Sequence, residues 1–169
     1  QGIIILDQNG KIYNYLDKIK GLQNNTILGL KVDHDDNLWI GSDNGIDYVN
    51  LNSEFKYYRD RDGELGTVYS AAVYQDKLYI GTNHGLFSAD WNSTELNLSS
   101  DFSFVENTQG QVWDLSVIDG VLFCGHNSGT FTVTNSGLQK ISDVSGGWIL
   151  RKVPNHPDLL IQGTYIGLV

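Results

Sequence analysis

Hydrophobic and polar residues alternate in short runs along this chain, and turns rich in glycine, asparagine and aspartate separate the runs. Short alternating runs with many β-branched and aromatic residues predict β-strands. Four such runs, at residues 28–33, 69–74, 112–118 and 148–153, are predicted to begin equivalent units. No segment has a convincing helical period, although residues 15–21 could form a short turn. The pattern therefore predicts an all-β protein.

One strand-turn-strand motif occurs four times, over residues 37–46, 77–86, 121–130 and 159–168. Each copy holds a first glycine and, four positions later, a second glycine. The first glycines recur after 40, 44 and 38 residues and are Gly41, Gly81, Gly125 and Gly163. A period of about 40 to 45 residues with four short strands indicates the blade of a β-propeller.

The outer strands of each predicted blade follow the motif. We predict them at 46–51 with 55–60, at 86–91 with 102–106, and at 130–134 with 138–142. Gly2 aligns with the second glycine of the motif, so the chain begins and ends at one point of the period. The predicted propeller segment thus has four-stranded antiparallel blades, arranged as an outer half-blade (1–20), blades at 26–60, 67–107 and 111–143, and an inner half-blade (147–169). We expect it to be a fragment of a larger propeller.

The two half-blades are complementary, because together they make one blade. Unpaired sheet edges are templates for pairing. We therefore expect self-association through the half-blades, as an eight-bladed ring or a swapped assembly. Closure within one chain into a four-bladed ring, or an open arc, are the alternatives.

Composition narrows the classes of partner. The chain has 169 residues, a formal net charge of −9 and scattered basic residues, which argues against binding to nucleic acid or to an anionic membrane surface. The longest aliphatic run, residues 3–6, is far too short for membrane insertion. Cys124 cannot form an internal disulfide, and it takes the strand position of Ile40 and Ile80. We interpret it as a small buried hydrophobic residue.

The letters Asp-Asn-Leu-Trp-Ile-Gly-Ser-Asp-Asn-Gly-Ile at residues 36–46 resemble the repeat of the two-component regulator propeller family. Residues 76–86 follow that repeat with Tyr79 in place of the tryptophan. The copy at 121–130 departs from it at Phe123, Cys124 and His126, and the copy at 159–168 departs at Ile161 and Gln162.

The resemblance implies the extracytoplasmic, periplasmic sensor region of an inner-membrane hybrid two-component regulator, as in gut Bacteroidetes such as Bacteroides. Such regions sense oligosaccharides and control genes for polysaccharide utilisation. The resemblance also implies that histidine kinase, phosphoacceptor and DNA-binding parts lie outside this chain. The chain itself would carry no catalytic step, and its partners would be a glycan and other blades or domains of the parent sensor.

Motifs for catalysis, metals or cofactors are absent from the sequence. There is no P-loop, no His-Glu-x-x-His, no Gly-x-Ser-x-Gly and no Cys-x-x-Cys. The four histidines sit at unrelated positions of the repeat. Residues 33–37 and 60–64 are dense in oxygen ligands but lack the spacing of an EF-hand loop, so we interpret them as polar turns. We expect no metal and no cofactor.

The side chains that could bind a ligand lie at two places in the repeat. One is where loops enter the inner strands, and the other is where turns follow the first glycines. These segments converge on one face of a propeller. Aromatic faces pack on the C–H surfaces of sugars, and charged or amide groups bind sugar hydroxyls. The candidates are Tyr69, Trp113, Trp148, Arg151, His126 and Arg59. Aromatic residues at strand starts also simply pack between blades, and that alternative stays open.

Two other positions of the repeat have predicted structural roles. Trp39, Tyr79, Phe123 and Ile161 share one position, and we assign them to the core between adjacent sheets. Ser42, Thr82 and Thr164 share another, where their hydroxyls are expected to tie the strand end to a neighbouring turn.

Three classes of function follow. The first is a sensor segment that binds a glycan or supports a domain that does. The second is a structural or dimerising propeller. The third is a propeller lyase or glycosidase, which requires clustered acid and base groups. No histidine or carboxylate recurs on the inner strands, although Asp114 lies on one of them.

Overall fold

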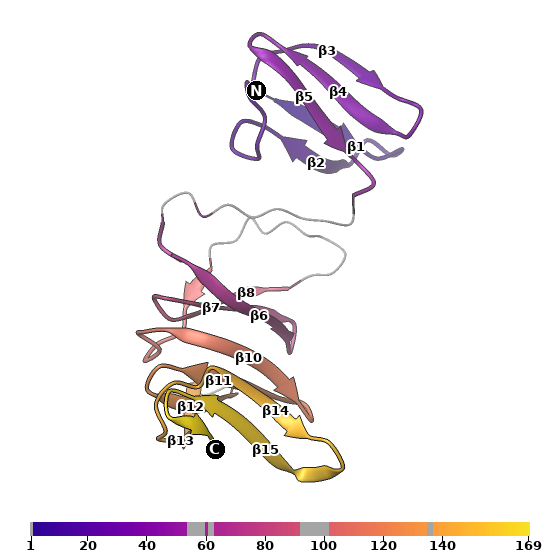
Figure 1. Cartoon of the computed structure of the whole chain (residues 1–169). Coiled ribbons are helices and arrows are strands. Elements are labelled where there is room, and N and C mark those ends of the chain that lie inside the picture. Colours follow the sequence, from indigo (N-terminus) through magenta and orange to yellow (C-terminus); the bar gives the residue numbers. More distant parts are fainter. Residues whose placement is uncertain (1, 54–59, 61–62, 92–101, 135–136) are drawn as a thin grey trace. The chain divides into compact units, whose positions relative to one another are not determined.

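The computed structural model describes residues 2–53, 60, 63–91, 102–134 and 137–169 (Figure 1). The chain divides into two compact units, unit 1 (Gln1–Tyr57) and unit 2 (Tyr58–Val169). In the described parts of both units every sheet is antiparallel, and none of these residues forms a helix. The prediction of an all-β segment of propeller blades is confirmed.

Unit 1 contains two sheets. Strands β1 (Ile3–Leu6) and β2 (Ile12–Leu16) form one, and β3 (Ile27–Val32), β4 (Asn37–Ser42) and β5 (Gly45–Asn50) form the other. The buried residues Ile3, Leu22, Leu38 and Ile40 make one hydrophobic cluster that joins the two sheets. The strand predicted at 55–60 lies outside the described residues except for Asp60, which is not in a strand.

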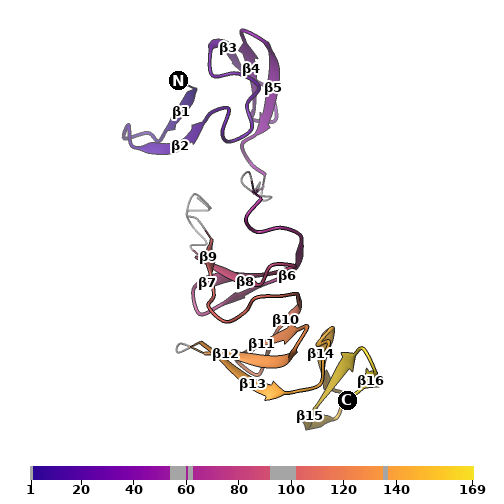
Figure 2. The ribbon, with the colours of Figure 1, turned by 90° about the vertical axis from the view of Figure 1, so that its left-hand side faces the viewer.

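Unit 2 contains three sheets. The first holds β6 (Val68–Tyr74), β7 (Lys77–Thr82), β8 (Leu86–Asp90) and β9 (Ser103–Phe104). The second holds β10 (Val112–Ile118), β11 (Val121–His126), β12 (Gly129–Thr134) and β13 (Gly137–Ser142). The third holds β14 (Ile149–Val153), β15 (His156–Thr164) and β16 (Gly167–Leu168). Within unit 2 the sheets stack in chain order, with β10 against both β6 and β14 (Figures 1 and 2).

The main core of unit 2 lies between its first two sheets. Leu86, Val112, Leu115, Leu122 and Cys124 are buried there, and Tyr79 packs against them. Alternation along each strand produces this arrangement, because successive side chains point to opposite faces. Cys124 is fully buried, as expected, and its burial raises the pKa of the thiol to about 12.

The core assignment of the Trp39 position is only partly right. Tyr79 packs into the core and Phe123 is half-buried, but Trp39 is 45% exposed and Ile161 is 37% exposed. This position faces the sheet that follows in the stack. Among the described residues of each unit, no sheet follows β3–β5 in unit 1 or β14–β16 in unit 2, so the core assignment of Trp39 and Ile161 was wrong.

The second glycines of the motif have a backbone conformation that other residues rarely adopt. Their φ angles are +121° at Gly45, +150° at Gly85, +137° at Gly129 and +131° at Gly167. Gly2 has a φ of +123°, which confirms that it is aligned with them. This left-handed region explains why the turn requires glycine at each copy.

Gly81 and Gly125, the first glycines of the second and third copies, have a different role, which is to let neighbouring sheets approach. A Cβ on Gly125 would collide with the carbonyl oxygen of Gly147, in the segment that leads into β14. A Cβ on Gly147 would lie 2.8 Å from the Cα of Gly125. The Gly125–Gly147 contact therefore fixes the backbone separation between the second and third sheets of unit 2.

Self-association through the half-blades stays a prediction. Strand β1 corresponds to the third strand of a blade and β2 to the fourth, while β14 and β15 correspond to the first and second. Part of the edge of β15 is already paired, because β16 (Gly167–Leu168), which corresponds to the start of the third strand, pairs with it at Gly163 and Thr164.

Substitution Gly125→Ala should destabilise the chain by at least about 2 kcal/mol, because the backbone of Gly147 must move to admit the methyl group. Gly41→Ala is the matched control. A Cβ there meets only the carbonyl oxygen of Gly29 at 3.9 Å, so its effect should stay within about 1 kcal/mol. Urea unfolding followed by far-UV circular dichroism measures both. Equal effects of the two variants would contradict the close-approach account.

Candidate functional site

Aromatic side chains stand at one repeated position of the inner strands in unit 2. The register of β6 shifts between Val68 and Ser70, and that of β10 shifts between Val112 and Asp114, which leaves Tyr69 and Trp113 as bulge residues. Trp148 comes directly before Ile149, the residue of β14 that pairs with a first glycine. Bulges re-aim side chains at the edge of a sheet. An aromatic residue thus lies at or directly before the start of each inner strand of unit 2, and two of the three are bulge residues.

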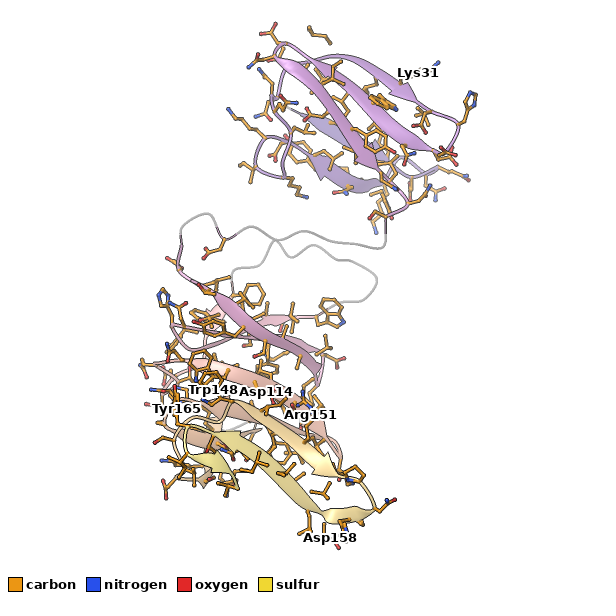
Figure 3. The ribbon with its side chains drawn as sticks, in the orientation of Figure 1. Lys31, Asp114, Trp148, Arg151, Asp158 and Tyr165 are labelled. Carbon is orange, nitrogen blue, oxygen red and sulfur yellow. The ribbon has the colours of Figure 1, made fainter. Side chains whose placement is uncertain are left out.

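These rings form a continuous row across the three sheets of unit 2. The centroids of Tyr69 and Trp113 are 4.7 Å apart, and those of Trp113 and Trp148 are 4.9 Å apart with the planes only 6° from parallel. Tyr165 meets Trp148 edge to face, with centroids 5.3 Å apart. We call Tyr69, Trp113, Trp148 and Tyr165 the aromatic row. Figure 3 shows Trp148 and Tyr165 beside each other on the third sheet.

Three rings of the row are exposed, and Trp113 is less accessible. Tyr69 is 40% exposed, Trp148 is 48% exposed and Tyr165 is 51% exposed, whereas Trp113 is half-buried between two neighbouring rings. Trp113 has a ring on each side, from Tyr69 and from Trp148. Any ring face that stacks on a ligand must therefore belong to Tyr69, Trp148 or Tyr165.

Tyr165 is the member of the row that sequence reasoning missed. It lies in the turn after a first glycine, at the variable position that holds Asp43, Asn83 and Asn127 in the other copies. Its hydroxyl donates to Asn127 Oδ1 at 3.0 Å, which links the third sheet to the turn of the second. The available signal was an aromatic residue at a position that is otherwise Asp or Asn.

A polar centre lies next to the row, on β10 and β14. Oδ2 of Asp114 accepts hydrogen bonds from the Leu150 backbone N–H at 3.1 Å and from the Ser116 hydroxyl at 2.7 Å. Nη1 of Arg151 lies 3.5 Å from the same oxygen. Figure 3 labels Asp114 and Arg151 of this pair. Asp114 follows Trp113 directly, and Trp148 directly precedes β14, so the stacked tryptophans lie at the start of the two strands that the Asp114–Arg151 pair joins.

His126 is the last residue of β11, and its ring is not part of the row. It is buried, its Nδ1 accepts a hydrogen bond from the Ser128 backbone N–H at 3.0 Å, and its ring meets Phe131 edge to face. Burial lowers the pKa of His126 from its ordinary value. Of the six predicted ligand residues, Tyr69, Trp113 and Trp148 belong to the row. Arg151 lies in the polar centre beside Asp114, His126 is buried, and Arg59 lies outside the described residues.

The predicted hydroxyl ties at the strand ends are confirmed. Ser42, Thr82 and Thr164 each donate to the carbonyl oxygen of the second glycine, at 3.1, 3.1 and 2.9 Å. His126 takes this position in the third copy and bonds within its turn through Ser128 instead.

The acidic turns use their oxygens internally. The hydrogen bond from the Asn37 backbone N–H, followed by that from the Trp39 indole, lowers the pKa of Asp33. Asp60 accepts hydrogen bonds from the backbone of Gly63, Leu65 and Gly66. In the described ranges, no group of three His, Cys, Asp or Glu side chains is placed to hold a metal ion. The interpretation of both segments as polar turns agrees with these contacts.

Comparison with known proteins identifies the repeat. Residues 21–44 match the family model described as two component regulator propeller, which confirms that the chain carries this repeat. No curated protein matches the chain. The segments that the structure describes include no helix long and apolar enough to cross a membrane.

Three similar solved structures are extracellular domains from B. thetaiotaomicron. Two are of BT4673, described once as a one component and once as a hybrid two component system, with 18% and 19% identity and TM-scores of 0.46 and 0.47. The third is of BT3049, described as a hybrid two component system, with 17% identity and a TM-score of 0.48. Each match covers 99% of this chain and 24% of the other. The chain thus spans about a quarter of the length of these domains.

The pKa of His126 predicts a pH dependence of stability. Because that pKa is lowered on folding, the unfolded chain takes up the proton first as the pH falls below about 6.5, and stability is lost in that range. The melting temperature should therefore fall less between about pH 7.5 and pH 5.5 in His126→Thr than in the wild type. Threonine is chosen because the second copy of the motif has Thr82 at the equivalent position. An exposed-turn substitution, His34→Thr, is the control and should leave the slope unchanged. Identical slopes in all three proteins would contradict the assignment.

Proposed function

We propose that this chain is a non-catalytic segment of the extracytoplasmic sensor region of a hybrid two-component regulator. The family match at residues 21–44 and the four copies of the motif support this class. On this proposal the region lies in the periplasm, the signal is an oligosaccharide that controls polysaccharide utilisation, and kinase activity belongs to another part of the parent protein. Other blades or domains of that parent are its partners.

The aromatic row is the observation that supports ligand binding. Aromatic rings are costly to leave in water, yet Tyr69, Trp148 and Tyr165 are each at least 40% exposed at one end of the inner strands. Asn127, next to Tyr165, is also exposed and carries an amide that can bond to hydroxyl groups. Exposed rings beside amide and charged groups have the chemistry of a sugar-binding surface.

The row also suggests how binding at one end could be transmitted. Its rings stack across the three sheets of unit 2, so a displacement of Tyr165 or Trp148 is resisted by Trp113 and Tyr69. On this proposal, a ligand that shifts one end of the row also shifts the neighbouring sheets that carry the other rings. This is the kind of coupled movement that a sensor needs in order to pass a signal to a kinase.

Two alternative functions are weaker on chemical grounds. In a purely structural or dimerising propeller the row would only hold the sheets together, and that role does not require exposed ends. A lyase or glycosidase would need a free acid and base. Asp114, the carboxylate on β10, is instead engaged through Oδ2 by Leu150, Ser116 and Arg151.

Calorimetric titration with a panel of neutral and acidic oligosaccharides tests the proposal. At least one sugar should bind, and Tyr165→Ala should weaken its binding about tenfold or more, because it removes an exposed ring at the end of the row. Trp113→Ala should mainly lower the melting temperature. Tyr48→Ala, which removes a comparably exposed ring in unit 1, should leave the affinity unchanged. Absence of binding to every sugar, by this chain and by its parent region, would refute the proposal, as would release of cleaved product.

A further inference from the structure

Arg151 occupies a repeat position where the other strands of unit 2 carry small residues. In β6, β10 and β14, the residues paired with the first glycines are Ser70, Asp114 and Ile149. Two residues further along, the corresponding side chains are Ala72, Ser116 and Arg151. The equivalent residue of unit 1 is Lys31, two positions after the partner of Gly41. Within unit 2, packing between the sheets does not require a long cation here. Its presence on β14 calls for another explanation.

The protein holds one nitrogen of this guanidinium group. Nη1 donates to the carbonyl oxygen of Leu150 at 2.6 Å and to the hydroxyl of Ser116 at 3.0 Å, and it lies 3.5 Å from Asp114 Oδ2. Within the described part of unit 2, Nε and Nη2 make no hydrogen bond, and the side chain is 57% exposed. The guanidinium plane is thus anchored on one side and open on the other.

The open side has the geometry of a carboxylate receptor. Nε and Nη2 of an arginine present two parallel N–H donors that match the two oxygens of a carboxylate. Because Nη1 already holds the arginine side chain in place, less side-chain conformational entropy is lost when a carboxylate binds. The neighbouring Lys152 does not offer such an open cation, because its Nζ donates to both carboxylate oxygens of Asp119, at 2.9 and 2.6 Å.

The open side lies close in the fold to the aromatic row. Asp114, which contacts Arg151, directly follows Trp113, and Trp113 stacks on Trp148, which directly precedes β14. Arg151 is the third residue of β14, so at about 3.3 Å per residue it lies about 10 Å along the chain from Trp148. Ligands with several linked rings are long enough to reach both. The chain is acidic overall, with a net charge of −9, so an anionic ligand needs a local cation of this kind.

We propose that Arg151 binds the carboxylate of a uronic acid unit, and that acidic oligosaccharides are the class of ligand recognised at this site. The inference rests on the proposed sensor function, because the aromatic row supplies the sugar-binding surface. Asp114 and Ser116 act as positioning residues that hold Nη1 and so orient the open side of the guanidinium.

Calorimetric titration with matched pairs of sugars tests this. Trimers of galacturonate and of glucuronate are compared with trimers of galactose and glucose. At least one acidic trimer should bind about tenfold or more tightly than its neutral counterpart, and its affinity should fall as salt is raised. Arg151→Lys keeps the charge but loses the paired donors, so it should weaken the acidic trimer about tenfold and change neutral binding less than twofold.

The controls separate failure of this inference from failure of the proposed function. Lys31→Gln changes the cation at the equivalent position of unit 1 and should have no effect. Melting temperatures of all variants should match the wild type, and Arg151→Gln serves as a second variant should Arg151→Lys fold poorly. Equal binding of acidic and neutral trimers, or an Arg151→Lys protein with unchanged selectivity, would overturn the inference and leave the sensor proposal standing. Binding of neither kind would overturn this inference, and absence of binding to the whole sugar panel by this chain and its parent region would overturn the sensor proposal as well. Displacement of the acidic trimer by an equal concentration of acetate would overturn the assignment to a sugar.

Discussion

The close approach of neighbouring sheets at the inner strands is the constraint on which the rest of unit 2 depends. At Gly125 and Gly147 the two backbones come so near that neither position can carry a Cβ without displacing the other. This approach brings β10 and β14 within reach of each other. It is therefore the condition for the stacking of Trp113 on Trp148 and for the contact between Asp114 and Arg151. The candidate site on β10 and β14 therefore depends on this glycine contact.

Local rules explain why much of the fold was predictable from the sequence. Strand β10 has the predicted bounds of 112–118, and the neighbouring inner strands differ by one residue at an end. The second glycines were predictable because a left-handed turn excludes most other residues. The hydroxyl of Thr82 bonds to Gly85 only three residues away, so its role needed no knowledge of distant parts.

Features that depend on neighbouring sheets were harder to predict. Trp39 was assigned to the core from its repeat position. Burial at this position also needs a following sheet that covers the side chain, and the sequence of a single blade does not show whether such a sheet is packed there. Tyr165 stands at a variable turn position, and only the fold places it against Trp148 and Asn127. The anchoring of Arg151 by Ser116 joins residues 35 apart in sequence, and periodicity within a blade carries no information about such a contact.

The most direct test of this account is the reactivity of Cys124, the single cysteine, which lies fully buried between the first two sheets of unit 2. With a thiol pKa raised to about 12 and no exposed surface, it should react with a thiol reagent at least about a hundredfold more slowly in native buffer than in denaturing urea. The urea midpoint of its reactivity should coincide with that of tryptophan fluorescence. Rapid labelling in native buffer would show that the sheets are not packed as described.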